Sequence, residues 1–308
     1  MPNMVYVLIT ILIAFSVYLG SEKLQDNVVN NSEANNLTNT VAQESRIDVA
    51  DNSELKIYYL DVGQADSIFI QNDGQNMLID AGNNDDGANI VQFLQGLGIT
   101  KIDFLVGTHP HEDHIGGLDD VINNFDIGII YMPKVATTTK TFESVLDAIE
   151  AKNLSVTTPV IGNEFSMGSA KFQILSTGTD EDDLNSCSIV LRLKFGNLAY
   201  LFTGDEETVN EEKMINSGYD LSADVLKVAH HGSNTSSSEE FLDRVSPDVA
   251  IIMVGEGNSY GHPHSEILNR LNARNIKIYR TDTDGTILIT SDGNKNDIQV
   301  LNDIDLNG

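Results

Sequence analysis

The sequence predicts an α+β protein in which β-sheets pack between layers of helices. Two observations carry this prediction. Short apolar runs of strand length recur between turn residues over most of the chain, whereas only a few segments show the apolar spacing of a helix. Many strands with a few helices to cover them favour sheets enclosed by helical layers.

The first elements begin at residue 55. Apolar runs predict strands at residues 56–60, 67–70, 77–79 and 102–106. The turn Asn72-Asp73-Gly74 connects the second and third of these as a hairpin. The fourth run is continuous, which is typical of a strand covered on both faces. Helical spacing predicts a helix over 88–97, which stops at Gly98.

The remainder of the chain continues this pattern. Further strands are predicted at residues 191–195, 198–202, 225–229, 249–253, 276–279 and 287–289. Further helices are predicted at residues 142–152, 206–216, 238–245 and 264–272. No short repeat and no second boundary interrupt this part, so we expect residues 55–308 to form one domain.

The amino-terminal segment is unlike this domain. Residues 1–21 carry no charged side chain, and the apolar run 5–19 is near the roughly 20 residues that span a bilayer. We expect a signal peptide or a membrane anchor, and therefore an extracellular protein or one anchored to the outer face of the cytoplasmic membrane. Residues 25–53 are polar and lack aromatic side chains, so residues 22–54 are expected to be a disordered linker.

The composition limits the possible partners. The 18 Lys and Arg residues against 46 Asp and Glu residues give a formal net charge of −28, so the chain has no broad basic surface for nucleic acid. Cys187 is the only cysteine, which excludes an intrachain disulfide. The composition gives no reason to expect a protein partner, and contact with a membrane is expected only through residues 1–21.

One turn concentrates metal-binding side chains. Three histidines and an aspartate fall within six positions after the apolar strand 102–106, and they are His109, His111, Asp113 and His114. Imidazole and carboxylate suit Zn, Mn or Fe. His109 and His111 can bind one ion, while Asp113 and His114 bind a neighbouring one. We therefore expect two divalent ions, Zn or Mn.

This turn has the H-x-H-x-D-H pattern, and the chain resembles the metallo-β-lactamase superfamily. Further motifs narrow the resemblance to the hydrolase domain of ComEC-type DNA-internalisation competence proteins: Asp61-Val62-Gly63-Gln64-Ala65-Asp66-Ser67, Ile79-Asp80-Ala81-Gly82, Thr203-Gly204-Asp205, His230-His231-Gly232-Ser233 and Tyr260-Gly261-His262-Pro263-His264. Ala65 stands where these competence proteins usually have a glycine. ComEC proteins also carry a multi-helix membrane channel, so a role in DNA uptake does not follow for a chain with one apolar segment.

The resemblance implies a fold and several roles. The fold is the αββα four-layer sandwich of the metallo-β-lactamases, with the metals at one edge of two mixed sheets. Asp205 matches the carboxylate that bridges two ions. Asp80 matches the aspartate that orients a ligand histidine through a hydrogen bond. Asp66 either helps to organise the site or only caps a strand.

Five more side chains follow from the later motifs. Neighbouring residues on a strand point to opposite faces, so His230 and His231 cannot be equivalent. We expect His230 to be the ligand and His231 to contact a substrate oxygen or to pack. Ser233 is a candidate donor to a phosphate. His262 and His264 lie in a Gly/Pro turn before a predicted helix, where His264 is expected to hold a phosphate oxygen or protonate the leaving group.

The third histidine typical of the first metal site in the superfamily is missing. Its place in the register falls near Ser186-Cys187-Ser188. We expect water or the Ser188 hydroxyl to complete that site, whereas Cys187 is expected to be a small buried hydrophobic residue rather than a ligand. A site with fewer ligands should bind metal less tightly and favour Mn over Zn.

These features predict a metal-dependent hydrolase that cleaves phosphodiesters outside the cytoplasm. Asp113 or Asp205 would orient a hydroxide, and His264 or the His230/His231 pair would hold the phosphate. The substrate is expected to be nucleic acid or a small or cell-surface phosphodiester. One alternative is lactam or lactone hydrolysis by the same ions, and another is a non-catalytic, metal-stabilised binding module.

Overall fold

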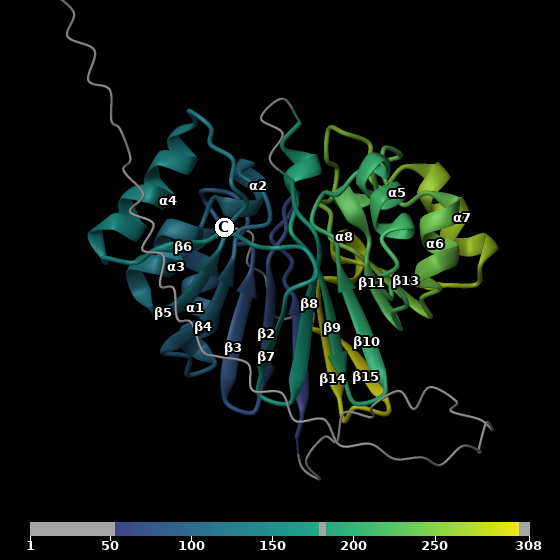
Figure 1. The fold of residues 1–308 in the computed structure, drawn as a ribbon, viewed down its shortest axis with the longest axis horizontal. Helices are drawn as coiled ribbons and strands as arrows, with labels where there is room; N and C mark the ends of the chain where they lie inside the picture. Colours follow the sequence, from purple (N-terminus) through teal and green to yellow (C-terminus); the bar gives the residue numbers. More distant parts are fainter. Residues whose placement is uncertain (1–52, 179–182, 302–308) are drawn as a thin grey trace, which may run out of the picture. The chain divides into compact units, whose positions relative to one another are not determined.

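A computed structural model describes residues 53–178 and 183–301. Two mixed sheets lie face to face between layers of helices (Figure 1). The first sheet contains, in spatial order, β15 (Asn296–Leu301), β14 (Thr286–Ser291), β1 (Leu55–Tyr59), β2 (Ile68–Asn72), β3 (Gln75–Ile79), β4 (Lys101–Val106), β5 (Asp126–Tyr131) and β6 (Val156–Thr157). The second contains β13 (Lys277–Arg280), β12 (Val249–Ile252), β11 (Val225–Lys227), β10 (Leu198–Phe202), β9 (Val190–Phe195), β8 (Ala170–Ser176) and β7 (Glu164–Met167).

Helices cover the outer face of each sheet. The helices that follow strands of the first sheet are α1 (Gly87–Gly96), α2 (Glu112–Ile115), α3 (Leu118–Asn124) and α4 (Lys140–Ala151). Those that follow strands of the second are α5 (Thr208–Asn216), α6 (Glu239–Val245), α7 (Ser265–Ala273) and α8 (Thr281–Asp284), with short 3₁₀ turns η1 (Asn185–Cys187) and η2 (Ala229–Gly232). The predicted four-layer αββα sandwich is therefore confirmed.

Alternation along the strands divides the buried side chains into layers. In β1, Ile57 and Tyr59 enter the core between the two sheets, whereas Tyr58 packs in the cluster under α1, α3 and α4. A third cluster lies under α5, α6 and α7. β4 contributes Phe104 to the central core and Leu105 to the outer one, as expected for a strand covered on both faces.

Most predicted elements are present, with small shifts at their ends. The Asp73-Gly74 hairpin turn has positive φ at both residues, as a tight two-residue turn requires. The strand expected over 225–229 ends at Lys227, which matters for the histidines that follow. Five strands were not predicted: β5, β6, β7, β8 and β15. Polar residues interrupt β8 and β15, so neither contains an apolar run longer than two residues.

The predictions for residues 1–21 and for most of the 22–54 linker fall outside the described residues and stay predictions. Among residues 53–178 and 183–301, no helix is both long enough and apolar enough to cross a membrane.

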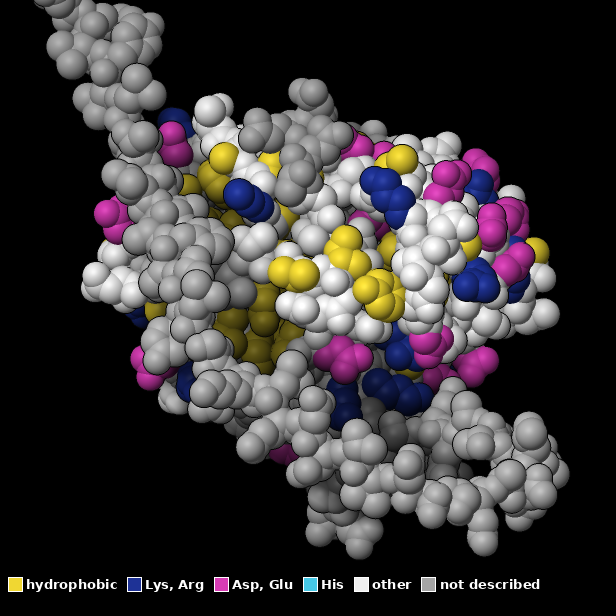
Figure 2. All heavy atoms as spheres, viewed as in Figure 1, with side chains coloured by type: hydrophobic (Ala, Val, Ile, Leu, Met, Phe, Trp, Pro, Cys, Tyr) yellow, Lys and Arg dark blue, Asp and Glu magenta, His cyan; other side chains and the backbone are white. Residues whose placement is uncertain are grey.

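The outer helices carry charges of both signs. Arg274, the residue that follows α7, pairs with Glu239 and Asp243 of α6 at 2.6 and 2.7 Å. On the face drawn in Figure 2, Lys and Arg side chains are scattered, and several of them have acidic side chains beside them. This face therefore offers no continuous basic stripe to a nucleic-acid backbone.

Close backbone packing holds the metal-binding turn against the loop after β3. Gly116 N donates to Gly82 O at 2.9 Å, and Ala81 N donates to His114 O at 2.7 Å. A Cβ atom at Gly116 would lie 2.2 Å from the carbonyl carbon of Asn83, which cannot move without shifting this loop.

We predict that Gly116→Ala destabilises the protein by about 1–3 kcal/mol, because the added methyl group overpacks this contact. Gly96→Ala is the matched control. A Cβ atom at this exposed end of α1 meets nothing within 4 Å, and alanine there should stabilise by up to about 1 kcal/mol. Urea unfolding monitored by circular dichroism measures both variants, and equal stabilities would contradict the prediction.

Candidate metal centre

Loops that leave the carboxyl ends of strands in both sheets build the candidate site. Asp80 directly follows β3, the segment His109–His114 follows β4, Asp205 follows β10 and His231 follows β11. β3 and β4 are parallel neighbours in one sheet, and β10 and β11 are parallel neighbours in the other. Residues far apart in the sequence therefore meet at one edge of the sandwich.

The first two histidines of the turn face one another. His109 is fully buried, and its Nε2 lies 3.0 Å from Nδ1 of the partly exposed His111. Burial lowers the pKa of His109 well below its usual value, and the nearby His114 lowers it further. His109 is therefore neutral, which is the form that binds a metal.

Asp80 fixes the third histidine. Its Oδ2 lies 2.8 Å from Nδ1 of His114, and its Oδ1 accepts a hydrogen bond from Thr108 N at 2.7 Å. The opposite nitrogen of the ring, His114 Nε2, is buried and has no hydrogen-bond partner among the described residues. Asp80 thus has the geometry of the orienting aspartate that the resemblance implies.

Four side chains converge at the centre. Asp113, His114, Asp205 and His231 each offer one ligand atom, and these atoms all lie within 4.8 Å of one another. His114 Nε2 is 3.3 Å from Asp205 Oδ1, and His231 Nε2 is 3.3 Å from Asp113 Oδ2. Asp205 Oδ1 is also buried without a hydrogen-bond partner in the described part of the chain. Such unpartnered buried atoms, aimed at one point, fit a divalent cation.

Both carboxylates of this group are held ionised. Burial raises the pKa of Asp205, but His114 and His231 outweigh it and lower the pKa well below its usual value. The pKa of Asp113 is lowered in the same way, because His114 and the contact with His231 outweigh its burial. Ionised carboxylates are the form that binds metal ions.

Lys227 is a site residue that sequence reasoning missed. It is fully buried at the end of β11, where its ammonium contacts Asp66 and donates to Gly204 O at 2.9 Å. It also lies 3.8 Å from Asp205 Oδ1. Burial lowers the pKa of Lys227, but Asp66 and Asp205 outweigh burial and raise the pKa above its usual value, so the lysine stays charged. The available signal was a lysine inside the otherwise apolar segment 225–229.

These contacts assign Asp66 to the centre rather than to a strand cap. Besides its ion pair with Lys227, its Oδ1 lies 3.5 Å from His231 Nδ1, and its Oδ2 lies 3.8 Å from His114 Nδ1. Its backbone N donates to Asp113 O at 3.0 Å. Asp66 therefore links the loop before β2 to the metal-binding turn.

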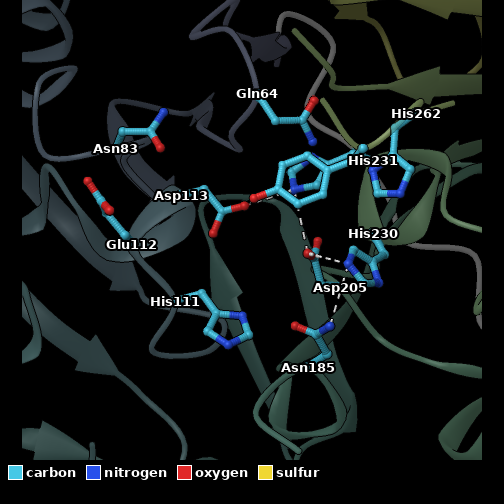
Figure 3. A pocket seen from close by; sticks show the side chains of 11 residues that line it. Gln64, Asn83, His111, Glu112, Asp113, Asn185, Asp205, His230, His231 and His262 are labelled. Atoms are coloured by element: carbon cyan, nitrogen blue, oxygen red, sulfur yellow. Dashed lines mark hydrogen bonds and ion pairs between the residues drawn. The ribbon is translucent and has the colours of Figure 1, made fainter. Parts of the chain in front are cut away.

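The preference for His230 over His231 is corrected by the geometry. The two residues do not lie on a strand, because β11 ends at Lys227 and both have a left-handed φ of 51°. His231 Nδ1 lies 2.9 Å from Met253 O, which leaves Nε2 facing Asp113 and Asp205. His230 lines the pocket and approaches Asp205 only to 3.8 Å (Figure 3).

His264 and Ser233 lie outside the centre, contrary to the roles expected for them. His264 Nδ1 accepts a hydrogen bond from Asn234 N at 3.0 Å, and Ser233 Oγ lies 3.1 Å from Thr235 Oγ1. Neither is among the described residues that line the pocket. His262 does line it, and burial together with His230 and His231 lowers its pKa to about 4, so this ring is neutral at neutral pH.

Ser188 and Cys187 do not extend the ligand set. Ser188 Oγ accepts a hydrogen bond from Asp205 N at 3.1 Å and lies 3.3 Å from His109 Nδ1, so it supports two ligands from the outer side. The Cys187 thiol is buried and donates to Asp183 O at 3.7 Å. Among the described residues, the groups close enough to share a metal do not include Cys187.

The centre opens into a cavity of about 500 Å³ (Figure 3). The described residues that line it are Gln64, Asn83, His111, Glu112, Asp113, Asn185, Asp205, His230, His231, Tyr260 and His262. Three are carboxylates, three are amides, and none is a lysine or an arginine. The Tyr260 ring stacks on His262 at 5.6 Å, and His262 lies 6.4 Å from His231, so aromatic rings continue from the rim to the centre.

The family model of the metallo-β-lactamase superfamily matches residues 60–256, so the chain belongs to this superfamily. Within it, the chain is 32% identical over 254 residues to ComE operon protein 3 of Bacillus subtilis, covering 76% of this chain and 33% of that protein. It is also 32% identical over 238 residues to Competence protein ComA of Neisseria gonorrhoeae, covering 76% of this chain and 32% of that protein. The resemblance to ComEC-type proteins is confirmed.

The chain spans about a third of the length of these two relatives. Among solved structures, CmlA, a diiron β-hydroxylase from Streptomyces venezuelae, matches with a TM-score of 0.53 and 15% identity, covering 82% of this chain and 55% of that one. At this identity the likeness shows the fold alone.

We predict that Lys227→Met destabilises the metal-free protein by about 3–5 kcal/mol, because it leaves buried carboxylates without their cation. Lys171→Met on the exposed side of β8 is the control and should change stability by no more than about 0.5 kcal/mol. Urea unfolding in the presence of a chelator measures both. A Lys227→Met protein as stable as the control would show that the ion pair does not support the fold.

The carboxyl group of Glu206, buried beside Asp205, should make the stability of the folded protein depend on pH. Burial raises its pKa from 4.5 to about 8. Between these values the folded protein holds a proton that the unfolded chain has released, so this group lowers stability as the pH rises through that window. We predict that Glu206→Gln melts at a higher temperature than wild type at pH 9 and at a similar temperature at pH 4.5.

Differential scanning fluorimetry across this pH range measures the effect. Glu212→Gln, on the exposed face of α5, should follow the wild-type curve. A Glu206→Gln protein that melts below wild type at pH 9 would contradict the assignment of a neutral, buried carboxyl group.

Proposed function

We propose that this hydrolase cleaves phosphodiesters with two divalent ions, Zn²⁺ or Mn²⁺, bound at the candidate centre. The observation that carries the proposal is the convergence of Asp113, His114, Asp205 and His231, with buried ligand atoms that lack other partners. Membership of the metallo-β-lactamase superfamily supports hydrolysis. The resemblance to ComEC-type DNA-internalisation competence proteins supports a substrate related to nucleic acid.

The residues divide into two sets around the ions. His109 and His111 would hold one ion, while Asp113, His114 and His231 would hold the other, with Asp205 as the shared carboxylate that the family resemblance implies. When bound, such ions lower the pKa of a water molecule and neutralise charge on phosphoryl oxygens. Asp80, Lys227 and Ser188 position these ligands through their contacts with His114, Asp205 and His109.

The protein's own groups orient the reactants. Asp113 and Asp205 stay ionised, so either can accept a hydrogen bond from the attacking water and align it. The neutral His262 and the amides of Gln64 and Asn83 face the cavity, where their N–H groups can donate to phosphodiester oxygens. His262 replaces His264 in the proposed substrate contact, because it lines the cavity and His264 does not.

The charge of the cavity supports a substrate with one phosphodiester at the site. No lysine or arginine is among the described residues that line it, so without metal the cavity does not attract a polyanion. A strand end of single-stranded nucleic acid or a small phosphodiester fits this environment better than a duplex. Action outside the cytoplasm, with residues 1–21 as a signal or anchor, is part of the proposal and rests on the sequence.

A substrate panel tests the proposal. We predict that the protein, loaded with Mn²⁺ or Zn²⁺, hydrolyses bis-p-nitrophenyl phosphate and single-stranded DNA faster than double-stranded DNA or the lactam nitrocefin. Asp113→Asn and Asp205→Asn should each reduce the rate by at least about 100-fold. Loss of a residue that only supports a metal ligand costs up to about 100-fold, and loss of a ligand itself should cost no less. Asp147→Asn, on the exposed face of α4, is the control and should keep the wild-type rate.

Other outcomes have defined meanings. Preferred hydrolysis of nitrocefin would favour the lactam hydrolase. Activity that persists in both the Asp113 and Asp205 variants would reveal a contaminating enzyme. Metal binding without turnover of any substrate would favour the non-catalytic, metal-stabilised module.

A further inference from the structure

The position around His109 and His111 lacks a third protein ligand from a histidine. The residues that the register places there are engaged elsewhere. Ser186 Oγ donates to Asp183 Oδ2 at 2.5 Å, and the Cys187 thiol contacts Asp183 O. Ser188 approaches His109 on its Nδ1 side, whereas His109 Nε2 is the nitrogen that faces His111. None of these three side chains is placed to complete this position.

Asn185 is placed differently. It begins η1 and lines the cavity together with His111 and Asp205. In Figure 3 its amide group projects into the space between His111 and His230. Its Oδ1 is buried, and it has no hydrogen-bond partner among the described residues.

The surroundings of Asn185 determine which end of the amide faces this space. Its Nδ2 lies 3.5 Å from Glu207 Oε1 and 3.5 Å from His230 Nε2. A carboxylate oxygen attracts the NH₂ group and repels the carbonyl oxygen, so Oδ1 must point the other way. Figure 3 draws this oxygen on the side of the amide that faces His111.

We infer that Asn185 Oδ1 is the third protein ligand of the first metal position, beside His109 and His111. This inference rests on the proposed two-metal function. An unpartnered carbonyl oxygen in this position would gain from a cation the contact that it lacks from the protein. A metal-bound imidazole and an amide are both neutral, so the shared carboxylate of Asp205 would be the only charged protein ligand at this position.

This ligand set has a consequence for metal choice. An amide oxygen is a hard donor that suits Mn²⁺, Mg²⁺ or Ca²⁺, whereas imidazole suits Zn²⁺. Replacing the third imidazole by an amide therefore weakens binding of Zn²⁺ more than that of Mn²⁺. The position should also be the first to lose its ion under mild chelation, since the four-residue group around Asp205 keeps charged ligands.

Calorimetric titration of the chelator-treated protein with Mn²⁺ tests the inference without using activity. Wild type should bind two ions. Asn185→Leu keeps the branched shape of the side chain but removes the oxygen, and it should bind one ion normally while the affinity for the other falls at least about tenfold. Asn185→Asp should restore two ions. Asn269→Leu, on the exposed face of α7, is the matched control and should bind two ions as wild type does.

Asn185→His provides a second readout. It supplies the missing imidazole, so elemental analysis after dialysis against equal Mn²⁺ and Zn²⁺ should find a higher Zn²⁺ share than in wild type. Two ions bound by Asn185→Leu with wild-type affinities would overturn the inference while leaving the proposed function intact. A wild-type protein that binds no ion would overturn both. If Asn185→Leu fails to fold, loss of one ion in Asn185→Asp would overturn the inference.

Discussion

Compensation of buried negative charge is the constraint on which this structure depends. Asp66, Asp80 and Asp205 are almost fully buried at one edge of the sandwich, and Asp113 adjoins them. Several carboxylates in a medium of low polarity are stable only when cations or hydrogen-bond donors surround them. Lys227 provides one permanent cation within the fold, and His114 bridges Asp80 and Asp205. Metal ions would supply the remaining positive charge, so folding and metal binding stabilise each other.

The fold could largely be predicted because its signals are local. The hairpin turn at Asp73-Gly74 and the continuous apolar run in β4 each identify a strand pair or a buried strand without knowledge of the rest of the chain. β8 and β15 were missed because polar residues interrupt their apolar residues. Their backbone hydrogen bonds to β9 and β14 hold them in the sheets, and no sequence pattern reveals those bonds. The ends of elements were less predictable. The two-residue error at the end of β11 led to the wrong choice between His230 and His231.

Residue spacing alone predicted the site only where its candidate ligands are close in the sequence, whereas Asp80 and Asp205 followed from the family resemblance. The segment from His109 to His114 can be identified from the sequence because one turn brings its side chains together. Lys227 and Asn185 come from other segments and belong to residue types that rarely identify a metal site, so only the fold reveals them. The choice between His230 and His231 failed because alternation on a strand was assumed, whereas both residues have a left-handed backbone that no sequence pattern signals.

The same charge compensation would couple binding of the proposed phosphodiester substrate to binding of the metal. The described residues that line the cavity include three carboxylates and no lysine or arginine, so a phosphodiester anion entering the metal-free cavity would meet net repulsion. Bound cations would reverse this repulsion, since they would attract phosphoryl oxygens and screen Asp113 and Asp205. Coupling of this kind is reciprocal, so a bound phosphodiester must tighten metal binding by the factor by which metal tightens phosphodiester binding. We expect this coupling between metal and phosphodiester binding to be largest at the metal position beside His109 and His111, because that position has the fewest charged protein ligands.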